Sequence, residues 1–453
     1  MVLLAVTACG TAATAVPASS VAPTAAAQAS CTVGTWAEEF THAGHLAWQV
    51  SLPVNGGLSV PFSPVQPLAA GRVSVFADGN VLYALRLRDG HQAWKKVFPE
   101  AKNSYAGVVY GLWQWHGSVV ALLGSNSSAP QLVALNAATG AVRWSLKLGA
   151  QELTDTQALT SDGVLALLTA PGRLEAASLT TGKLLWTREY GESAGPLAVG
   201  TTVIATKPFG PLATVTRTVA GFDARTGKVL WSRHGLPDTT SVAAAPGGRV
   251  LLYDAAPPPL TLNPKPAPVI ALSAATGRTL WQLNTAKPVT AAWADSAGVV
   301  IATGLQGTVY VQDPTARLYL ADLATGKVRW SAGGTHADPY TTPLITTTDV
   351  VYVATTPATG TVIDRKLSTG AVRWKAVISD VYGRFLDRPS GPEVLVTFPV
   401  AAHTSRLLAI DASTGKTRAT VNLPARVSAP PTITGSRILM QPATPTCVPP
   451  VAP

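Results

Sequence analysis

The side chains that most often carry out chemistry in proteins are scattered along this sequence. Its seven histidines never fall at the spacing that metal ligands adopt, and the nearest pair is His42 and His45. The 24 Asp and Glu residues include no Asp-rich calcium loop. No residue can be assigned a catalytic role, and we expect no metal site.

Trp113 and Trp115 alternate in the segment YGLWQWHG, so both side chains point to one face of a strand. Two neighbouring aromatic rings can form a platform for a sugar. The same pattern is also typical of rings packed in a core, and we favour the core interpretation.

The three cysteines lie near the ends of the chain. Cys9 ends the segment Val6-Thr7-Ala8-Cys9, which resembles a lipobox, the motif whose cysteine is acylated in bacterial lipoproteins. No Lys or Arg precedes Cys9 and the apolar run is short, so residues 1–9 are interpreted as a truncated signal whose true start lies upstream. The alternative is an ordinary cysteine in a disordered tail.

Residues 10–30 are rich in Ala, Thr, Ser and Pro and carry no charge, which predicts a flexible linker before a folded region at 31–453. Cys31 and Cys447 flank that region, so we expect a disulfide between them outside the cytoplasm; two free thiols are the alternative. No later run of 18 apolar residues predicts a transmembrane helix.

The net charge of +10 is spread along the chain rather than concentrated on one element, so we expect no nucleic-acid binding. Many basic residues follow a repeated glycine, and counting by twos puts them on the outer wall of the fold. They would attract an anionic envelope polymer or a lipid surface. The alternative, which we favour, is a solvated edge that discourages aggregation. These residues are Lys183, Lys228, Arg278, Lys327, Lys416, Arg143, Arg329, Arg373 and Arg418.

The sequence is organised by a repeated turn, small-x-Asp/Asn/Ser-x-x-Thr-Gly-x-x-x-Trp, which recurs roughly every 40–50 residues. The last copy has Gly415 and carries Ala419 in the tryptophan position. The other glycine and tryptophan pairs are Gly90 and Trp94, Gly140 and Trp144, Gly182 and Trp186, Gly227 and Trp231, Gly277 and Trp281, Gly326 and Trp330, and Gly370 and Trp374.

Each part of this motif has a mechanical role. Glycine ends a hairpin loop in a positive-φ conformation, and the Asp, Asn or Ser side chain accepts hydrogen bonds from loop amides. The tryptophan buries roughly 150–250 Å², a gross gain of about 4–6 kcal/mol. A single small sheet cannot cover such a ring, so each sheet must stack on the next.

A second pair of strand signals precedes each turn, as in TTPLITTTDVVYVATT. Each unit therefore holds four antiparallel strands, and units of this length are typical of β-propeller blades. No window shows a sustained helical period. We predict an all-β fold, a single β-propeller of four-stranded antiparallel blades.

The two ends of the chain contain incomplete units. Gly44 and Trp48 repeat the Gly-x-x-x-Trp spacing without a strand before the turn, and SAPPTITGSRILMQPA near the C-terminus provides two strands without a tryptophan. We expect the N-terminal strand to complete the last blade and to close a monomeric ring. Eight blades are favoured because propellers typically have four to eight, and nine is the alternative.

The repeated string resembles the tryptophan-docking repeat of the quinoprotein-type, PQQ-like propeller family over about residues 40–450. Within that family, the lipobox and the non-catalytic propeller most resemble the propeller lipoproteins of the outer-membrane barrel assembly machinery. The resemblance implies an extracytoplasmic protein, anchored by a lipid at Cys9 or secreted. It would act as a scaffold for envelope proteins of unknown identity and need no cofactor.

Enzymes of the same family give the alternative, a PQQ-dependent dehydrogenase or a degenerate quinoprotein. Such enzymes hold pyrroloquinoline quinone (PQQ) with Ca²⁺ and add an adjacent Cys-Cys pair, which this sequence lacks. A second alternative is a ligand-sensing ectodomain. We expect no enzymatic activity.

Overall fold

The structure is a computed structural model, and it describes the chain in the following ranges: 30–36, 46–53, 65–99, 108–124, 129–149, 152–170, 172–190, 194–209, 216–254, 268–304, 316–333, 337, 341–355, 360–378, 385–387, 393–401, 404–423, 432–434 and 437–440. No helix within these ranges has the length and hydropathy needed to span a bilayer.

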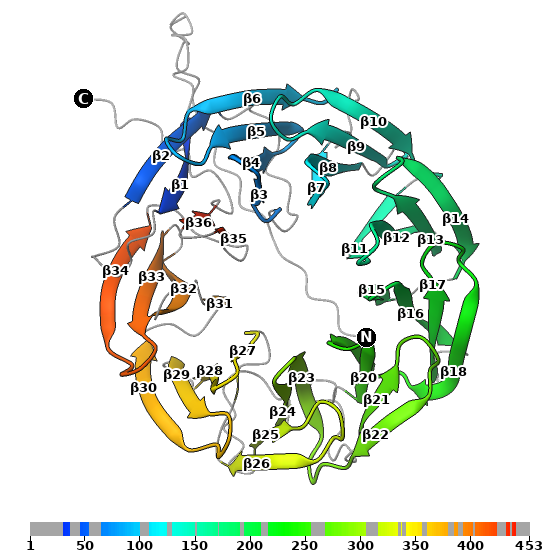
Figure 1. The fold of residues 1–453 in the computed structure, drawn as a ribbon, viewed down its shortest axis with the longest axis vertical. Coiled ribbons are helices and arrows are strands. Elements are labelled where there is room, and N and C mark those ends of the chain that lie inside the picture. The colour runs from blue at the N-terminus through cyan, green and yellow to red at the C-terminus, as the bar shows by residue number, and fades with distance from the viewer. Residues whose placement is uncertain are drawn as a thin grey trace, which may run out of the picture.

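The strands form nine four-stranded antiparallel sheets in the described part of the chain. Figure 1 shows these sheets arranged around a common centre, with one edge strand of each near the centre and the other on the circumference. We call the sheets blades 1 to 9 in chain order from β3, and blade 9 is the sheet that contains both ends of the chain.

The strands of blades 1 to 3 are given from the innermost outward. Blade 1 contains β3 (Leu68–Ala70), β4 (Val73–Asp78), β5 (Val81–Arg86) and β6 (Gln92–Val97). Blade 2 contains β7 (Val108–Trp115), β8 (Ser118–Gly124), β9 (Gln131–Asn136) and β10 (Val142–Lys147). Blade 3 contains β11 (Glu152–Leu159), β12 (Val164–Ala170), β13 (Arg173–Ser178) and β14 (Lys183–Glu189).

Blades 4 to 6 follow the same order. Blade 4 contains β15 (Ala194–Val199), β16 (Thr202–Phe209), β17 (Thr216–Asp223) and β18 (Val229–Pro237). Blade 5 contains β19 (Thr240–Ala245), β20 (Arg249–Asp254), β21 (Val269–Ser273) and β22 (Thr279–Leu283). Blade 6 contains β23 (Val289–Asp295), β24 (Gly298–Thr303), β25 (Arg317–Ala321) and β26 (Val328–Gly333).

The last three blades complete the ring. Blade 7 contains β27 (Leu344–Ile345), β28 (Asp349–Thr355), β29 (Gly360–Lys366) and β30 (Val372–Ile378). Blade 8 contains β31 (Phe385–Asp387), β32 (Glu393–Ala401), β33 (Thr404–Asp411) and β34 (Thr417–Leu423). Blade 9 contains β35 (Thr432–Thr434), β36 (Arg437–Met440), β1 (Ser30–Trp36) and β2 (Leu46–Pro53).

The predicted all-β class and the four-stranded antiparallel blades are confirmed. The favoured count of eight blades is not confirmed, because the described residues form nine such sheets. The difference comes from the N-terminal segment, which contributes two strands rather than one. β1 pairs with β36 from Gly34 opposite Met440 to Trp36 opposite Ile438, and β2 pairs with β1.

The terminal features predicted from sequence lie mostly outside the described residues. Cys9, the linker up to residue 29 and Cys447 are among the residues that the structure does not describe, whereas Cys31 lies in β1. Acylation of Cys9 and a Cys31–Cys447 disulfide therefore stay predictions.

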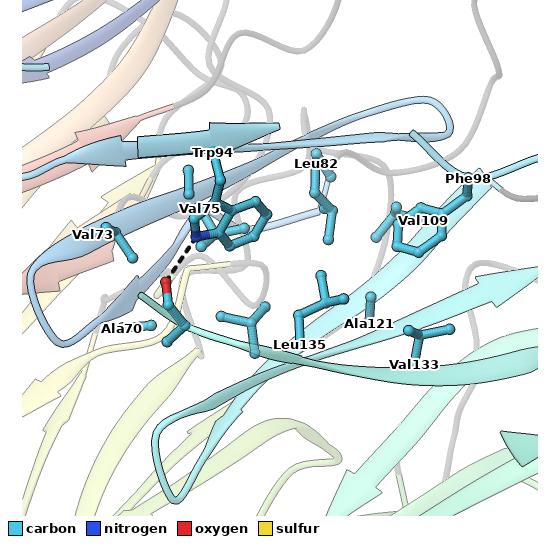
Figure 2. Packing of buried hydrophobic residues seen from close by; sticks show 14 of the residues in the cluster. Ala70, Val73, Val75, Leu82, Trp94, Phe98, Val109, Ala121, Val133 and Leu135 are labelled. Carbon is cyan, nitrogen blue, oxygen red and sulfur yellow. Dashed lines mark hydrogen bonds between the residues drawn. The ribbon is translucent and has the colours of Figure 1, made fainter. Parts of the chain in front are cut away.

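The hydrophobic core lies between successive blades. The cluster between blades 1 and 2 combines Val75, Leu82 and Trp94 from one blade with Ala121 and Leu135 from the next. Figure 2 shows these side chains filling the space between the two sheets. Clusters of the same kind join blades 2 and 3, 3 and 4, 4 and 5, 5 and 6, 6 and 7, and 7 and 8.

The motif turn is held by its own polar side chain, as predicted. In blade 6 the carboxylate of Asp322 accepts hydrogen bonds from the amides of Ala324 and Thr325, each at 3.0 Å. Arg329 donates a further hydrogen bond at 2.7 Å, and this contact lowers the pKa of Asp322 to about 2. Asn136, Asp223 and Asp411 cap their turns in the same way.

In blades 1 to 7 the motif tryptophan packs against the motif glycine of the following blade. The ring of Trp231 in blade 4 lies so close to Gly277 in blade 5 that a Cβ there would come within 2.6 Å of ring carbons. Six of the indoles are less than a tenth exposed and donate from Nε1 to a backbone carbonyl of the next blade. The pairs are Trp94 to Ala137, Trp186 to Ala224, Trp231 to Ala274, Trp281 to Leu323, Trp330 to Leu367 and Trp374 to Ala412.

Three copies of the motif differ from this pattern. Trp144 packs on Gly182 but is only partly buried. Trp48 lies in β2 of blade 9, and the repeat would pair it with Gly90 of blade 1. The side chain of Trp48 is outside the described residues, so this contact stays a prediction. Ala419 is buried in β34 opposite Ala409, so no indole leads from blade 8 towards blade 9.

The glycine of the motif has two reasons to be glycine. At Gly277 the backbone φ is +66°, a conformation that side chains with a Cβ avoid, and the ring of Trp231 occupies the space where a Cβ would lie. Gly235 has a similar φ of +69°, but no atom lies within 4 Å of its Cβ position. An alanine at Gly235 would therefore test backbone strain alone, whereas an alanine at Gly277 would test strain together with overpacking.

We predict that Gly277→Ala lowers the free energy of unfolding by about 1–3 kcal/mol more than Gly235→Ala does. Both variants incur backbone strain of roughly 1 kcal/mol, and only Gly277→Ala also overpacks a core contact. Urea denaturation followed by tryptophan fluorescence measures both losses. Equal losses would show that the indole does not press on the glycine.

Candidate functional site

The two faces of the disc differ in the length of their connections. Neighbouring strands are antiparallel, so the first-to-second and third-to-fourth connections leave each blade at one end, which we call the turn face. The second-to-third connections and those between blades leave at the other end, which we call the loop face.

The turn face carries short connections. The first and second strands are joined by residues 71–72 in blade 1, 116–117 in blade 2 and 200–201 in blade 4, and the third and fourth strands by the motif turns. The loop face carries the long connections, which include residues 255–268 in blade 5, 304–316 in blade 6, and 98–107 and 334–343 between blades.

Charged side chains at the described edge of the loop face are fixed by partners. Arg173 forms an ion pair with Glu189 at 3.0 Å, and Arg217 with Asp238 at 3.4 Å. Arg217 also donates to the carbonyl of Thr240 at 3.3 Å. Sequence analysis did not find these residues, because they lie in strands outside the repeated motif.

Glu175 is the most deeply buried charged side chain near this face. It lies in β13, has no exposed surface, and accepts a hydrogen bond from the amide of Gly149 in the preceding blade at 3.3 Å. Arg173 comes within 3.8 Å, and Glu189 adds a second negative charge nearby. Burial raises the pKa of Glu175, against the opposing effects of Gly149 and Arg173.

Trp115 lies at the turn-face end of β7 and is partly buried. The ring stacks on His116 with centroids 4.5 Å apart, and a Cβ on Gly163 in blade 3 would overlap it. Its Nε1 donates to Thr180 at 2.9 Å. Trp113 and Trp115 both pack against the core between blades 2 and 3, so the core interpretation fits and a sugar platform does not.

The basic residues of the outer wall divide into two groups. The arginines directly before a tryptophan bind polar groups of their own blade. Arg143 donates a hydrogen bond to Ser118 at 2.8 Å, and Arg373 forms an ion pair with Asp349 at 2.6 Å. Arg329 and Arg418 bind carboxylates in the same manner. The residues directly after the motif glycine, such as Lys183 and Lys228, are exposed on the wall.

The described residues contain no group of three His, Cys, Asp or Glu side chains able to hold a metal ion. The glycine and tryptophan positions that the repeat singled out lie between successive blades and hold them together.

We predict that Glu175→Gln raises the midpoint of thermal unfolding at pH 7 by roughly 1–3 °C. Because folding raises the pKa of this carboxyl, its ionised form opposes folding above its unfolded pKa, and the wild-type chain recovers stability as the pH falls. The advantage of the variant should therefore shrink between pH 7 and pH 4. An advantage that grows at low pH would contradict the burial of the charge.

Comparisons with known proteins agree with this architecture. A family model described as outer membrane protein assembly factor BamB matches residues 113–245 and 215–392. The outer membrane protein assembly factor BamB of Yersinia pestis is 28% identical over 266 residues, which cover 52% of this chain and 58% of that protein. The chain thus matches less than two thirds of the length of this relative.

Two solved structures resemble the chain. BamB from Moraxella catarrhalis has a TM-score of 0.41 and 18% identity, and the match covers 79% of this chain and 96% of that one. A eukaryotic initiation factor has a TM-score of 0.59 and 11% identity and covers 92% and 99% of the two chains, a likeness of fold alone. Because the family model matches more than half of the sequence, the chain belongs to the PQQ-like propeller family described as outer membrane protein assembly factor BamB.

Proposed function

We propose that this chain is a non-catalytic propeller of the cell envelope that binds other envelope proteins as a scaffold. Membership of a family named for outer membrane assembly supports a location outside the cytoplasm. The monomeric ring would be held at the membrane by a lipid on Cys9, with residues 10–30 as a tether.

The observation that carries the binding role is the asymmetry between the loop face and the turn face. Long connections on a rigid ring present varied side chains while the sheets beneath them stay fixed. The connections 255–268 and 304–316 belong to adjacent blades 5 and 6, so two of the long segments leave neighbouring sheets at the same end. A partner protein would bind there.

We predict that shortening both connections abolishes capture of the envelope partner. Residues 257–266 and 306–314 are each replaced by Gly-Ser-Gly in the tagged full-length chain, and partners are quantified by crosslinking, pull-down and mass spectrometry. Ala138→Glu and Ala324→Glu, at exposed positions of the motif turns on the opposite face, serve as the control. Loss of the same partners in the control, or retention in the loop variant, would refute the loop face as the binding surface.

A quinone-dependent dehydrogenase is the competing function. The described residues do not fit the quinone with Ca²⁺, because they gather no group of three carboxylate, histidine or cysteine ligands and the chain has no Cys-Cys pair. We derive no catalytic step from this cofactor.

We predict that micromolar PQQ with Ca²⁺ leaves the thermal midpoint of the full-length chain unchanged. A ligand present at about 100 times its dissociation constant would stabilise the fold by about 2.7 kcal/mol, which a thermal shift assay detects readily. Ca²⁺ alone is the control. A rise in midpoint that requires the quinone would favour the dehydrogenase.

A further inference from the structure

The outer wall of blades 3, 4 and 5 exposes aliphatic side chains beside basic ones. Figure 1 shows β14, β18 and β22 following one another along the circumference. Directly before the tryptophans, these strands carry Leu184 and Leu185, Val229 and Leu230, and Leu280, each 38% to 47% exposed. Together with Lys183, Lys228 and Arg278, which come just after each motif glycine, we call these residues the wall patch.

A β-bulge explains why two successive residues face outward. In blade 3 the register runs from Leu184 opposite Ala177 to Trp186 opposite Ala176, so Leu185 is an extra residue in the outer strand. The same shift precedes Trp231 and Trp281. Strict alternation would turn the residue two positions before the tryptophan inward, and the bulge leaves it exposed.

The three cations of the wall patch are not neutralised. Among the described residues, the side chains of Lys183, Lys228 and Arg278 form no ion pair. The nine outermost strands carry a single carboxylate, Glu189, which is paired with Arg173.

The acidic groups nearest the patch on the turn face are also occupied. Asp162 binds Arg225 at 2.7 Å, and Asp223 accepts hydrogen bonds from its own turn. In blades 3 and 5 the capping position of the turn holds the neutral Ser178 or Ser273 rather than a carboxylate, and Ser178 accepts a hydrogen bond from the amide of Thr181. The patch therefore presents a local excess of positive charge.

Two exposed aliphatic residues precede the tryptophan in each of blades 3 and 4, whereas blades 2, 6 and 7 expose one each, Val142, Val328 and Val372. In blades 2, 6 and 7 the residue directly before the tryptophan is Arg143, Arg329 or Arg373, and each bonds within its own blade. In blades 3 and 4 the arginine lies two positions after the tryptophan instead, and it donates a hydrogen bond to the next blade. Arg188 donates to the carbonyl of Gly227, and Arg233 donates to that of Gly277. The aliphatic residues of the patch stay free to contact a partner.

We propose that the wall patch lies on an anionic lipid bilayer surface. A soluble anionic polymer would bind the three cations but leave five aliphatic side chains in water, and an apolar protein groove would bury three unpaired cations. The headgroup region of a bilayer accepts both, because aliphatic groups enter the acyl boundary while lysine and arginine reach the phosphates. This inference does not depend on the scaffold function, since it needs no protein partner.

The test uses the full-length chain with Cys9→Ser, so that no lipid anchor contributes. Binding is measured by co-sedimentation with phosphatidylcholine vesicles and with vesicles containing 30% phosphatidylglycerol. The triple variant Lys183→Glu, Lys228→Glu and Arg278→Glu should lose at least about tenfold in affinity for anionic vesicles. The control Lys147→Glu, Lys375→Glu and Lys416→Glu makes the same charge change elsewhere on the wall and should lose less than about threefold.

A second variant tests the aliphatic half of the proposal. Leu185→Ser with Leu230→Ser should weaken binding to anionic vesicles about fivefold or more, whereas Val142→Ser with Val372→Ser, at exposed wall positions of blades 2 and 7, should not. Thermal midpoints establish that the variants remain folded. Equal losses in patch and control variants, or no effect of the leucine pair, would overturn the bilayer proposal.

Discussion

The structure depends on one repeated contact, an indole ring of one blade lying flat against the backbone of the next at a glycine. Six of these rings also donate a hydrogen bond to the neighbouring blade, so each contact joins a large apolar surface to a directional bond. Seven core clusters show the same arrangement, because they combine residues from two successive blades. Because each docked indole is covered by the following blade, stability is shared between neighbouring blades.

The sheet that joins the N-terminal strands β1 and β2 to the C-terminal strands β35 and β36 differs from the other blades. Blade 8 carries Ala419 where the other blades carry tryptophan, and the following blade is assembled from both ends of the chain. Backbone pairing between β1 and β36 joins the two ends there. Strand hydrogen bonds between β36 and β1 hold blade 9 together, whereas docked indoles join the successive described blades from blade 1 to blade 8.

Much of this architecture could be read from the sequence, since the Gly-x-x-x-Trp spacing fixes both the hairpin and the side chain that docks. The contribution of β1 could not, because Ser30–Trp36 lies outside the repeat and one of its two partner strands, β36, comes from the far end of the chain. The bulge before each tryptophan was also missed, because alternation by twos assumes a regular ladder. Glu175 was missed because its burial depends on Gly149 in another blade.

These features give the disc three surfaces with different chemistry. The strands leave long connections at the loop face, which we propose as the surface for protein partners, and short connections at the turn face, whereas the wall of blades 3 to 5 is basic and aliphatic. All three depend on a rigid ring, because the docked indoles keep the blades, and hence the surfaces, in register.

Hydrogen exchange of the indole Nε1–H groups, followed by nuclear magnetic resonance on the full-length chain, tests the docked indoles most directly. The account predicts that the indoles of Trp94, Trp186, Trp231, Trp281, Trp330 and Trp374 exchange only through global unfolding, whereas the partly buried Trp144 exchanges faster. Rapid exchange of the six hydrogen-bonded indoles in the folded protein would contradict it.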